Sequence, residues 1–193
     1  TMLRIFSLLL FSLLLIGKAS AQILPSTAAE IEASLRQRAD LVSSSILKEF
    51  PVRSVGPVVM SGRVTDLAVH PENPRIFYVG FGSAGIFKST NSGNTMTPIF
   101  DHQGGALGIG DLAISHANPD VLWAGTGENN SSRSTYAGTG VYKSMDAGQS
   151  WEYVGLRNTQ HIGRIITHPT DVNTAWVASV GALYTSNPER GVY

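Results

Sequence analysis

Residues 62–74, GRVTDLAVHPENP, return as residues 108–119, GIGDLAISHANP, and in shortened form as residues 161–169, HIGRIITHP. Each copy reads as a strand of alternating character that ends in a turn rich in Pro, Asn or His. The step from Pro74 to Pro119 is 45 residues, so the chain repeats at a nearly fixed interval. A sequence period of this kind decides the fold before any single motif does.

Further short runs follow each copy and correspond in the same way: IFYVG at 76–80, VLWAG at 121–125 and TAWVA at 174–178. A period of roughly 40–50 residues with about four short strands is typical of a propeller blade. The sequence therefore predicts an all-β fold, a β-propeller of four-stranded blades. In the first repeat we expect strands at Val64–Val69, Ile76–Val79, Gly85–Ser89 and Met96–Phe100.

The last residues of the chain match the middle of a repeat. Residues 190–193, RGVY, correspond to residues 139–142, TGVY, at the start of a third strand. We therefore expect residues 51–193 to form the first blades of a propeller, about two and a half of them, truncated in the third blade. A blade alone cannot bury both of its faces, so such units stack on one another.

The N-terminus predicts export. Arg4 supplies a positive charge, residues 5–16 are apolar, and an Ala-Ser-Ala sequence ends at Ala21. This order is typical of a signal peptide, here residues 1–21, cleaved between Ala21 and Gln22. The apolar run is short for a bilayer span, which disfavours an uncleaved anchor. The prediction is a secreted or periplasmic protein without a membrane segment after cleavage.

Residues 22–50 predict a helical spacer in front of the propeller. Thr27 and Glu30 have the spacing of a capping box, and Pro51 would end a helix running over residues 26–50. Two uses are open for this helix: it binds a partner, or it packs against the propeller rim as a spacer.

Composition excludes several classes of function. The 14 basic and 14 acidic residues cancel, and without the leader the balance is slightly acidic, so no basic surface is expected for nucleic acid. There is no cysteine, which excludes disulfides and thiolate metal sites. His161 and His168 lack a spacing typical of metal ligands. We predict no metal and no cofactor.

A second motif recurs at the third and fourth strands. Residues 144–151, SMDAGQSW, form a complete Asp-box, and residues 89–96, STNSGNTM, form a degenerate one. An Asp or Asn side chain can hydrogen-bond its own turn, and glycine permits the positive φ that such a turn requires. Because the motif recurs once per blade, we assign it a structural role. The residues are Ser144, Asp146, Gly148, Trp151, Ser89, Asn91 and Gly93.

These repeats, together with WAGTGENN at 123–130 and HIGR at 161–164, resemble a group of large exported bacterial proteins. The group is described as sortilin-N-terminal-like or "glycosyl hydrolase, BNR repeat" proteins, and its propellers are similar to those of sortilin and of family 74 xyloglucanases. The resemblance runs from about Phe50 to Tyr193. It implies a propeller, but it does not choose between ligand binding and hydrolysis.

The resemblance to xyloglucanases predicts a catalytic aspartate after the second strand of the first blade. The matching stretch, residues 78–85, reads YVGFGSAG and has Gly82 at the aspartate position. A glycosidase of this kind needs two carboxyl groups across the scissile bond, so catalytic residues stay unassigned. A sialidase is disfavoured, since only Arg75 echoes its arginine cluster.

Propeller geometry sends the second-to-third strand loops and the connections between blades to one face. The first of these loops needs only residues 82–84, whereas the second carries an insertion over residues 128–137. Insertions gathered on one face are typical of a binding face. The candidate ligand-binding residues are Glu128, Asn129, Asn130, Arg133, Tyr136, Arg63, His161 and Arg164.

An alternative is purely structural: residues 128–130 form a capped turn, and Arg63 pairs with Asp66. The preferred function is a secreted binding or interaction module with a peptide or protein ligand. The alternative is a glycoside hydrolase of the xyloglucanase-like propeller type acting on a polysaccharide, and a scaffold is a third possibility. A facing pair of carboxylates would distinguish them, and the oligomeric state is left open.

Overall fold

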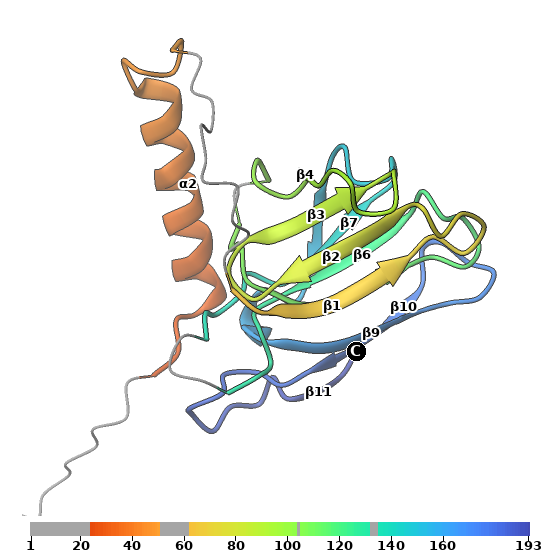
Figure 1. Ribbon diagram of the computed structural model, residues 1–193. Helices are drawn as coiled ribbons and strands as arrows, with labels where there is room; N and C mark the ends of the chain where they lie inside the picture. The colour runs from red at the N-terminus through yellow and green to blue at the C-terminus, as the bar shows by residue number, and fades with distance from the viewer. Residues whose placement is uncertain (1–23, 51–61, 104, 132–134) are drawn as a thin grey trace, which may run out of the picture.

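The computed structural model describes residues 24–50, 62–103, 105–131 and 135–193 (Figure 1). The predicted signal peptide with its cleavage site between Ala21 and Gln22, and the candidate Arg133, lie outside the described residues.

The described chain is built mainly from antiparallel sheets, each formed by consecutive strands. The first two repeats give four-stranded sheets with the orders β1-β2-β3-β4 and β5-β6-β7-β8, and the third gives a three-stranded sheet with the order β11-β10-β9. The bounds are Val64–Val69 (β1), Phe77–Phe81 (β2), Gly85–Ser89 (β3), Thr97–Pro98 (β4), Ile109–Ile114 (β5), Leu122–Thr126 (β6), Val141–Ser144 (β7), Glu152–Gly155 (β8), Ile162–Thr167 (β9), Ala175–Ser179 (β10) and Gly191–Val192 (β11), with the short helix η1 at Arg157–Thr159.

The prediction of an all-β chain with four-stranded repeat units is confirmed. Two strand boundaries were wrong. The second strand starts at Phe77 and continues to Phe81, and the fourth shrinks from residues 96–100 to Thr97–Pro98. Pro98 has no amide hydrogen to donate, which limits pairing there.

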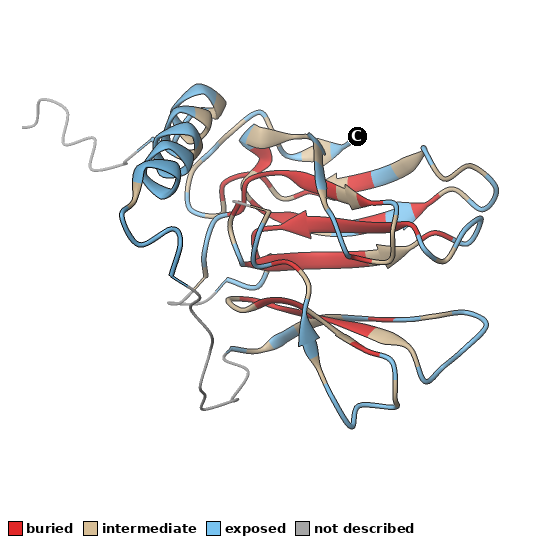
Figure 2. Ribbon diagram, turned by 90° about the horizontal axis from the view of Figure 1, so that it is seen from above, coloured by how far each residue is buried: buried red, intermediate tan, exposed pale blue. Residues whose placement is uncertain are grey.

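Helix α2 spans Ala28–Ser44 and begins with the expected capping box at Thr27. Its predicted continuation to Phe50 is wrong. No residue of α2 is buried, so tertiary packing does not extend the helix, and Ser44 Oγ donates to Asp40 O (2.7 Å) near its end. Figure 2 shows α2 largely exposed beside the sheets. Among the residues that the structure describes, no helix has the length and apolar character needed to cross a bilayer.

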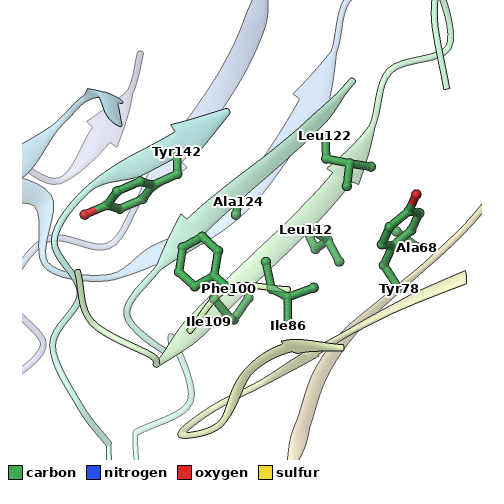
Figure 3. Close-up of a cluster of buried hydrophobic side chains, with 9 residues drawn as sticks. All are labelled: Ala68, Tyr78, Ile86, Phe100, Ile109, Leu112, Leu122, Ala124 and Tyr142. Atoms are coloured by element: carbon green, nitrogen blue, oxygen red, sulfur yellow. The ribbon is translucent and has the colours of Figure 1, made fainter. Parts of the chain in front are cut away.

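The core lies between neighbouring sheets. Inner strand β1 packs beside β5, and β5 packs beside β9. Alternation along the strands places apolar side chains between the sheets, where burial stabilises each by about 1.5–3 kcal/mol. Figure 3 shows the cluster shared by the first and second sheets, formed by Ala68, Tyr78, Ile86, Phe100, Ile109, Leu112, Leu122, Ala124 and Tyr142.

The close approach of the sheets depends on a small residue in the second strand of each repeat. A Cβ built on Gly80 would lie 2.8 Å from Ile109 Cγ2 of the next sheet, and Gly125 meets Ile162 in the same way. Each glycine thus leaves room for an isoleucine of the following inner strand. The equivalent residue of the third sheet is Ala178.

A recurring aspartate joins successive inner strands. Asp66 Oδ2 accepts a hydrogen bond from Leu112 N (2.9 Å), and Asp111 Oδ2 accepts one from Ile165 N (2.7 Å). Both carboxylates therefore satisfy an amide of the next sheet, which fixes the offset between sheets. The third repeat carries Arg164 at this position, and its Nη1 lies 3.4 Å from Asp111 Oδ1.

Replacing Asp66 tests this joint. In the full-length protein, Asp66→Ala should lower the free energy of unfolding by about 1–3 kcal/mol, because Leu112 N–H loses its acceptor. Asp66→Asn keeps an acceptor oxygen and should cost less. Denaturant unfolding measures the loss of stability in each variant, and hydrogen exchange shows whether the Leu112 amide is still protected. Equal stability of Asp66→Ala and the unmodified protein, with that amide still protected, would show that the joint does not depend on Asp66.

Candidate functional site

The turn at residues 144–151 uses its polar side chains locally. Asp146 Oδ1 accepts hydrogen bonds from Ser150 N and from Ser144 Oγ, both at 2.8 Å, and Gly148 has φ +90°. Hydrogen bonds, that of the Ser150 side chain first, lower the pKa of Asp146. Its carboxylate is therefore occupied within the turn and is not presented to a ligand.

The turn at residues 89–96 has the same construction. Asn91 Oδ1 accepts from the amide four residues later (2.9 Å), and Gly93 N donates to Ser89 Oγ (2.8 Å). Between the two turns, Trp151 Nε1 donates to Ile99 O (2.8 Å). The polar side chains of both turns are therefore used within the turns themselves, and Trp151 links the second sheet to the first.

On the opposite face, the inserted loop begins with a buried carboxylate. Glu128 is fully buried, and both of its carboxylate oxygens accept hydrogen bonds from Arg63, through Nε and Nη2. Asn130 Nδ2 also reaches Glu128 Oε1 (3.4 Å). The structural alternative that paired Arg63 with Asp66 is thus corrected, because the Asp66 carboxylate binds the backbone amides of Leu67 and Leu112. A forked guanidinium–carboxylate pair of this kind joins the loops of two sheets.

The Glu128 carboxylate lies over Gly82 of the first sheet. A Cβ built on Gly82 would lie 2.8 Å from Glu128 Oε2. A side chain at position 82 and the observed Glu128 conformation therefore exclude each other. This place on the face does hold a carboxylate, but it comes from the second sheet and is neutralised by Arg63.

A second buried carboxylate lies between the inner strands. Asp111 is 4% exposed, and burial raises its pKa to about 6. The Asp66 carboxylate raises it further, whereas the amide of Ile165 and the charge of Arg164 oppose the shift. Because the Asp111 carboxylate accepts the hydrogen bond of Ile165 N in the next sheet, we assign Asp111 a structural role.

A groove of about 500 Å³ lies on the loop face. We call it the loop groove. Four parts of the chain enclose it: residues 24–26 together with the first turns of α2, the end of the inserted loop, the connection from the second to the third sheet, and the loop after β10. Its lining residues are Leu24, Pro25, Ser26, Ile31, Thr135, Ala137, Gly138, Thr139, Gln160, His161, Ala182, Leu183, Tyr184 and Thr185.

Two glycines let the inserted loop approach the connection between sheets. Gly127 has φ +84°, and a Cβ there would overlap Gln160 O. Gly138 N donates to the same Gln160 O (2.6 Å). The backbone around Gln160 is therefore held against both ends of the insertion, which shapes one wall of the loop groove.

The start of α2 forms the opposite wall. Ala28 N donates to Asn158 Oδ1 (2.7 Å), and Gln160 Nε2 reaches Ser26 O (3.4 Å). Helix α2 contacts η1 through this first turn. The N-terminal segment thus belongs to the loop groove, which gives the predicted helical spacer a place in the site.

His161 joins the buried carboxylate to the loop groove. The residue lines the groove although it is only 4% exposed, and its Nδ1 lies 2.7 Å from Glu128 O. Its backbone oxygen accepts from Val180 N (2.9 Å). Burial lowers the pKa of His161, more than the carbonyl and carboxylate of Glu128 raise it. The ring is therefore neutral at neutral pH.

The structure brings together some of the candidate residues and separates others. Arg63, Glu128, Asn130 and His161 are connected around the Glu128 side chain and carbonyl. The others lie apart from this group. Asn129 Nδ2 donates to Gly163 O (3.1 Å), Tyr136 is 57% exposed outside the loop groove, and Arg164 lies beside Asp111.

Six polar groove residues were not among the candidates: Ser26, Thr135, Thr139, Gln160, Tyr184 and Thr185. Tyr184 follows the second strand of the third repeat, so the comparison of loop lengths that located the insertion at 128–137 could also have pointed to Tyr184. Gln160 gave no such signal, because its place depends on contacts with residues more than 130 positions away. Within the described ranges, no group of three His, Asp or Glu side chains is arranged to hold a metal ion.

No protein-family model and no curated protein matches the chain. Solved structures are similar over part of it. An ancestral GH74 enzyme is 22% identical with a TM-score of 0.49, and the match covers 62% of this chain and 16% of that one. A GH74 enzyme of Niastella koreensis (25% identity, TM-score 0.44) and the GH74 xyloglucanase from Xanthomonas campestris (18% identity, TM-score 0.44) each match 58% of this chain, and 16% and 18% of their own chains. The chain thus spans less than a fifth of each of these proteins. The function is therefore derived from the site itself.

The pKa of Asp111 gives a pH-dependent prediction. Its value of about 6 in the folded protein lies above the ordinary 3.8, so the folded state binds more protons and stability falls as pH rises through this window. Asp111→Asn keeps an acceptor for Ile165 N and removes the buried charge. This variant should lose less stability as the pH rises, and above pH 6 its free energy of unfolding should be higher by up to about 3 kcal/mol.

Unfolding free energies measured from pH 4 to pH 8 test this expectation, with the exposed Asp120→Asn as control. An unchanged pH profile in Asp111→Asn would contradict it.

Gly82→Asp tests the exclusion between position 82 and Glu128. The added side chain should displace Glu128 from Arg63 and lower the free energy of unfolding by about 1–3 kcal/mol. The double variant Gly82→Asp with Glu128→Ala gives Arg63 a new carboxylate and removes the clash, so it should recover most of that loss. Chemical denaturation of the full-length variants provides the measurement. If Gly82→Asp alone is as stable as the unmodified protein, the two side chains do not compete for this space.

Proposed function

We propose that the three sheets are successive blades of an exported β-propeller, and that the loop groove binds a neutral, polyhydroxylated ligand, specifically a polysaccharide. The observation that carries the proposal is the uncharged lining of the loop groove. Among the residues that the structure describes, none that lines the groove is Lys, Arg, Asp or Glu. The pKa of the one histidine among them, His161, is lowered by burial.

The lining suits sugars in its chemistry. Ser26 supplies a hydroxyl group, Gln160 supplies an amide, and apolar side chains lie between them. The hydroxyls of Thr135 and Thr139 are bonded to Asn130 O and Tyr142, and that of Thr185 is buried. Tyr184, which is 64% exposed at the groove, adds a ring on which a sugar can stack. Ligand sites of this kind combine apolar surface with a few placed polar groups. Charged peptide side chains would find no countercharge in the groove, which favours a polysaccharide over the peptide ligand considered first.

The described residues support binding better than hydrolysis. Hydrolysis requires an acid and a base or nucleophile on opposite sides of the scissile bond. Glu128 is bound by Arg63, and Asp111 is bound by Ile165 N and neighbours Arg164. Neither is available as one of that pair in this arrangement.

Hydrolysis by the whole protein is a second candidate, favoured by one observation: a carboxylate, that of Glu128, lies over Gly82, where a xyloglucanase-type aspartate would project. Release of reducing sugar from xyloglucan by the full-length protein, abolished by Glu128→Gln, would establish hydrolysis and overturn a binding-only function.

Tyr184→Ala tests the polysaccharide proposal. Losing a stacking ring should weaken binding of a xyloglucan oligosaccharide by about tenfold, equivalent to about 1.4 kcal/mol. Tyr136→Ala removes an exposed tyrosine outside the loop groove and serves as the matched control. Calorimetric titration of the full-length protein measures both.

Because the groove is uncharged, roughly 0.5 M salt should leave the affinity unchanged. Binding of acidic or basic peptides that salt abolishes, without glycan binding, would refute the proposal.

A further inference from the structure

The two ring nitrogens of His161 have different surroundings. Nδ1 lies 2.7 Å from the backbone oxygen of Glu128. Nε2 has no hydrogen-bond partner among the described residues. The residue is more than nine-tenths buried and is one of those that line the groove. Nε2 is thus a polar atom that keeps some solvent access and has no partner within the described protein, in a residue of the groove wall where a ligand can complete its hydrogen bonding.

The contact with Glu128 fixes the tautomer of the ring. A carbonyl oxygen only accepts hydrogen bonds, so Nδ1 must carry the hydrogen. Burial lowers the pKa of His161, while the carboxylate of Glu128 acts in the opposite direction and is itself paired with Arg63. The ring is therefore neutral, and Nε2 keeps its lone pair as an acceptor.

The Arg63–Glu128 pair fixes the carbonyl that sets this tautomer. Both side-chain oxygens of Glu128 are held by the guanidinium of Arg63, so the Glu128 backbone has little freedom to turn its carbonyl away. On the other side, Val180 N holds the backbone oxygen of His161 (2.9 Å). Arg63 and Glu128 thus act on the ligand through His161, as positioning residues.

We propose that His161 Nε2 accepts a hydrogen bond from a ligand hydroxyl in the loop groove, and that the Glu128 carbonyl holds the ring in the tautomer that allows it. The inference rests on the proposed function and adds a rule of specificity. A hydroxyl can donate to this acceptor, whereas an ether or O-methyl group cannot. The site should therefore select free hydroxyls, since a ligand that covers this acceptor without donating to it leaves it unpaired at a cost in affinity.

Nitrogen-15 NMR of the full-length protein tests the tautomer without any ligand. We expect the Nδ1–H form for His161 at neutral pH. His168 provides an internal control of opposite sign, because its Nδ1 accepts from Thr170 N (3.2 Å) and Asp171 N (3.0 Å) and so leaves the hydrogen on Nε2. Detection of the Nε2–H or the charged form at His161 would overturn the inference, whether or not glycans bind.

Two variants test the ligand contact. His161→Asn keeps a donor near the Nδ1 position and lacks the Nε2 acceptor, so the affinity for a xyloglucan oligosaccharide should fall about tenfold. His161→Gln places an amide oxygen near the Nε2 position and should recover part of the affinity. His168→Asn, in an exposed turn, should bind like the unmodified protein.

A per-O-methylated form of the same oligosaccharide should bind weakly to the unmodified protein and should not distinguish it from His161→Asn. Equal affinity of His161→Asn and the unmodified protein for the free oligosaccharide would refute the contact while leaving the proposed function intact. If the unmodified protein shows the Nδ1–H tautomer but binds no glycan, the proposed function fails, and the ligand contact fails with it.

Discussion

The rest of the structure depends on the contact between neighbouring inner strands. A four-stranded sheet of this size cannot bury both of its faces, so β1, β5 and β9 must pack closely to enclose a core. Gly80 and Gly125 leave room for an isoleucine of the next sheet, and Asp66 and Asp111 each accept an amide from it. The apolar contact supplies most of the free energy, while the carboxylate–amide bonds set the offset between sheets.

That offset determines which loops meet. The loop after β6, the connection before β9 and the loop after β10 all leave the sheets on the same face, and the start of α2 joins them through Asn158 and Gln160. The result is a groove whose described lining residues carry no charged side chain, with a buried ion pair beside it. The Arg63–Glu128 pair is a weak source of stability once desolvation is counted. Its effect on the site is geometric, because it fixes the backbone that holds His161.

Much of the fold could be predicted from the sequence because its signal is local and repeated. The inner strands of all three repeats lie where the period places them, and the capping box at Thr27 starts the helix as its residues require. The helix end could not be predicted in this way. Residues 45–50 continue a helical pattern, but no packing surface extends the helix beyond Ser44.

The sequence by itself determined the strand period, the sheet order within each repeat and the face that carries the inserted loop, since each follows from neighbours along the chain. The glycine at position 82 also came from the sequence. Only the tertiary structure showed that Glu128 of the next sheet fills the space above Gly82 and that Arg63 neutralises it. Likewise, the tautomer of His161 depends on a carbonyl 33 residues away. Contacts of this range arise from the packing of one sheet on another, and no local pattern encodes them.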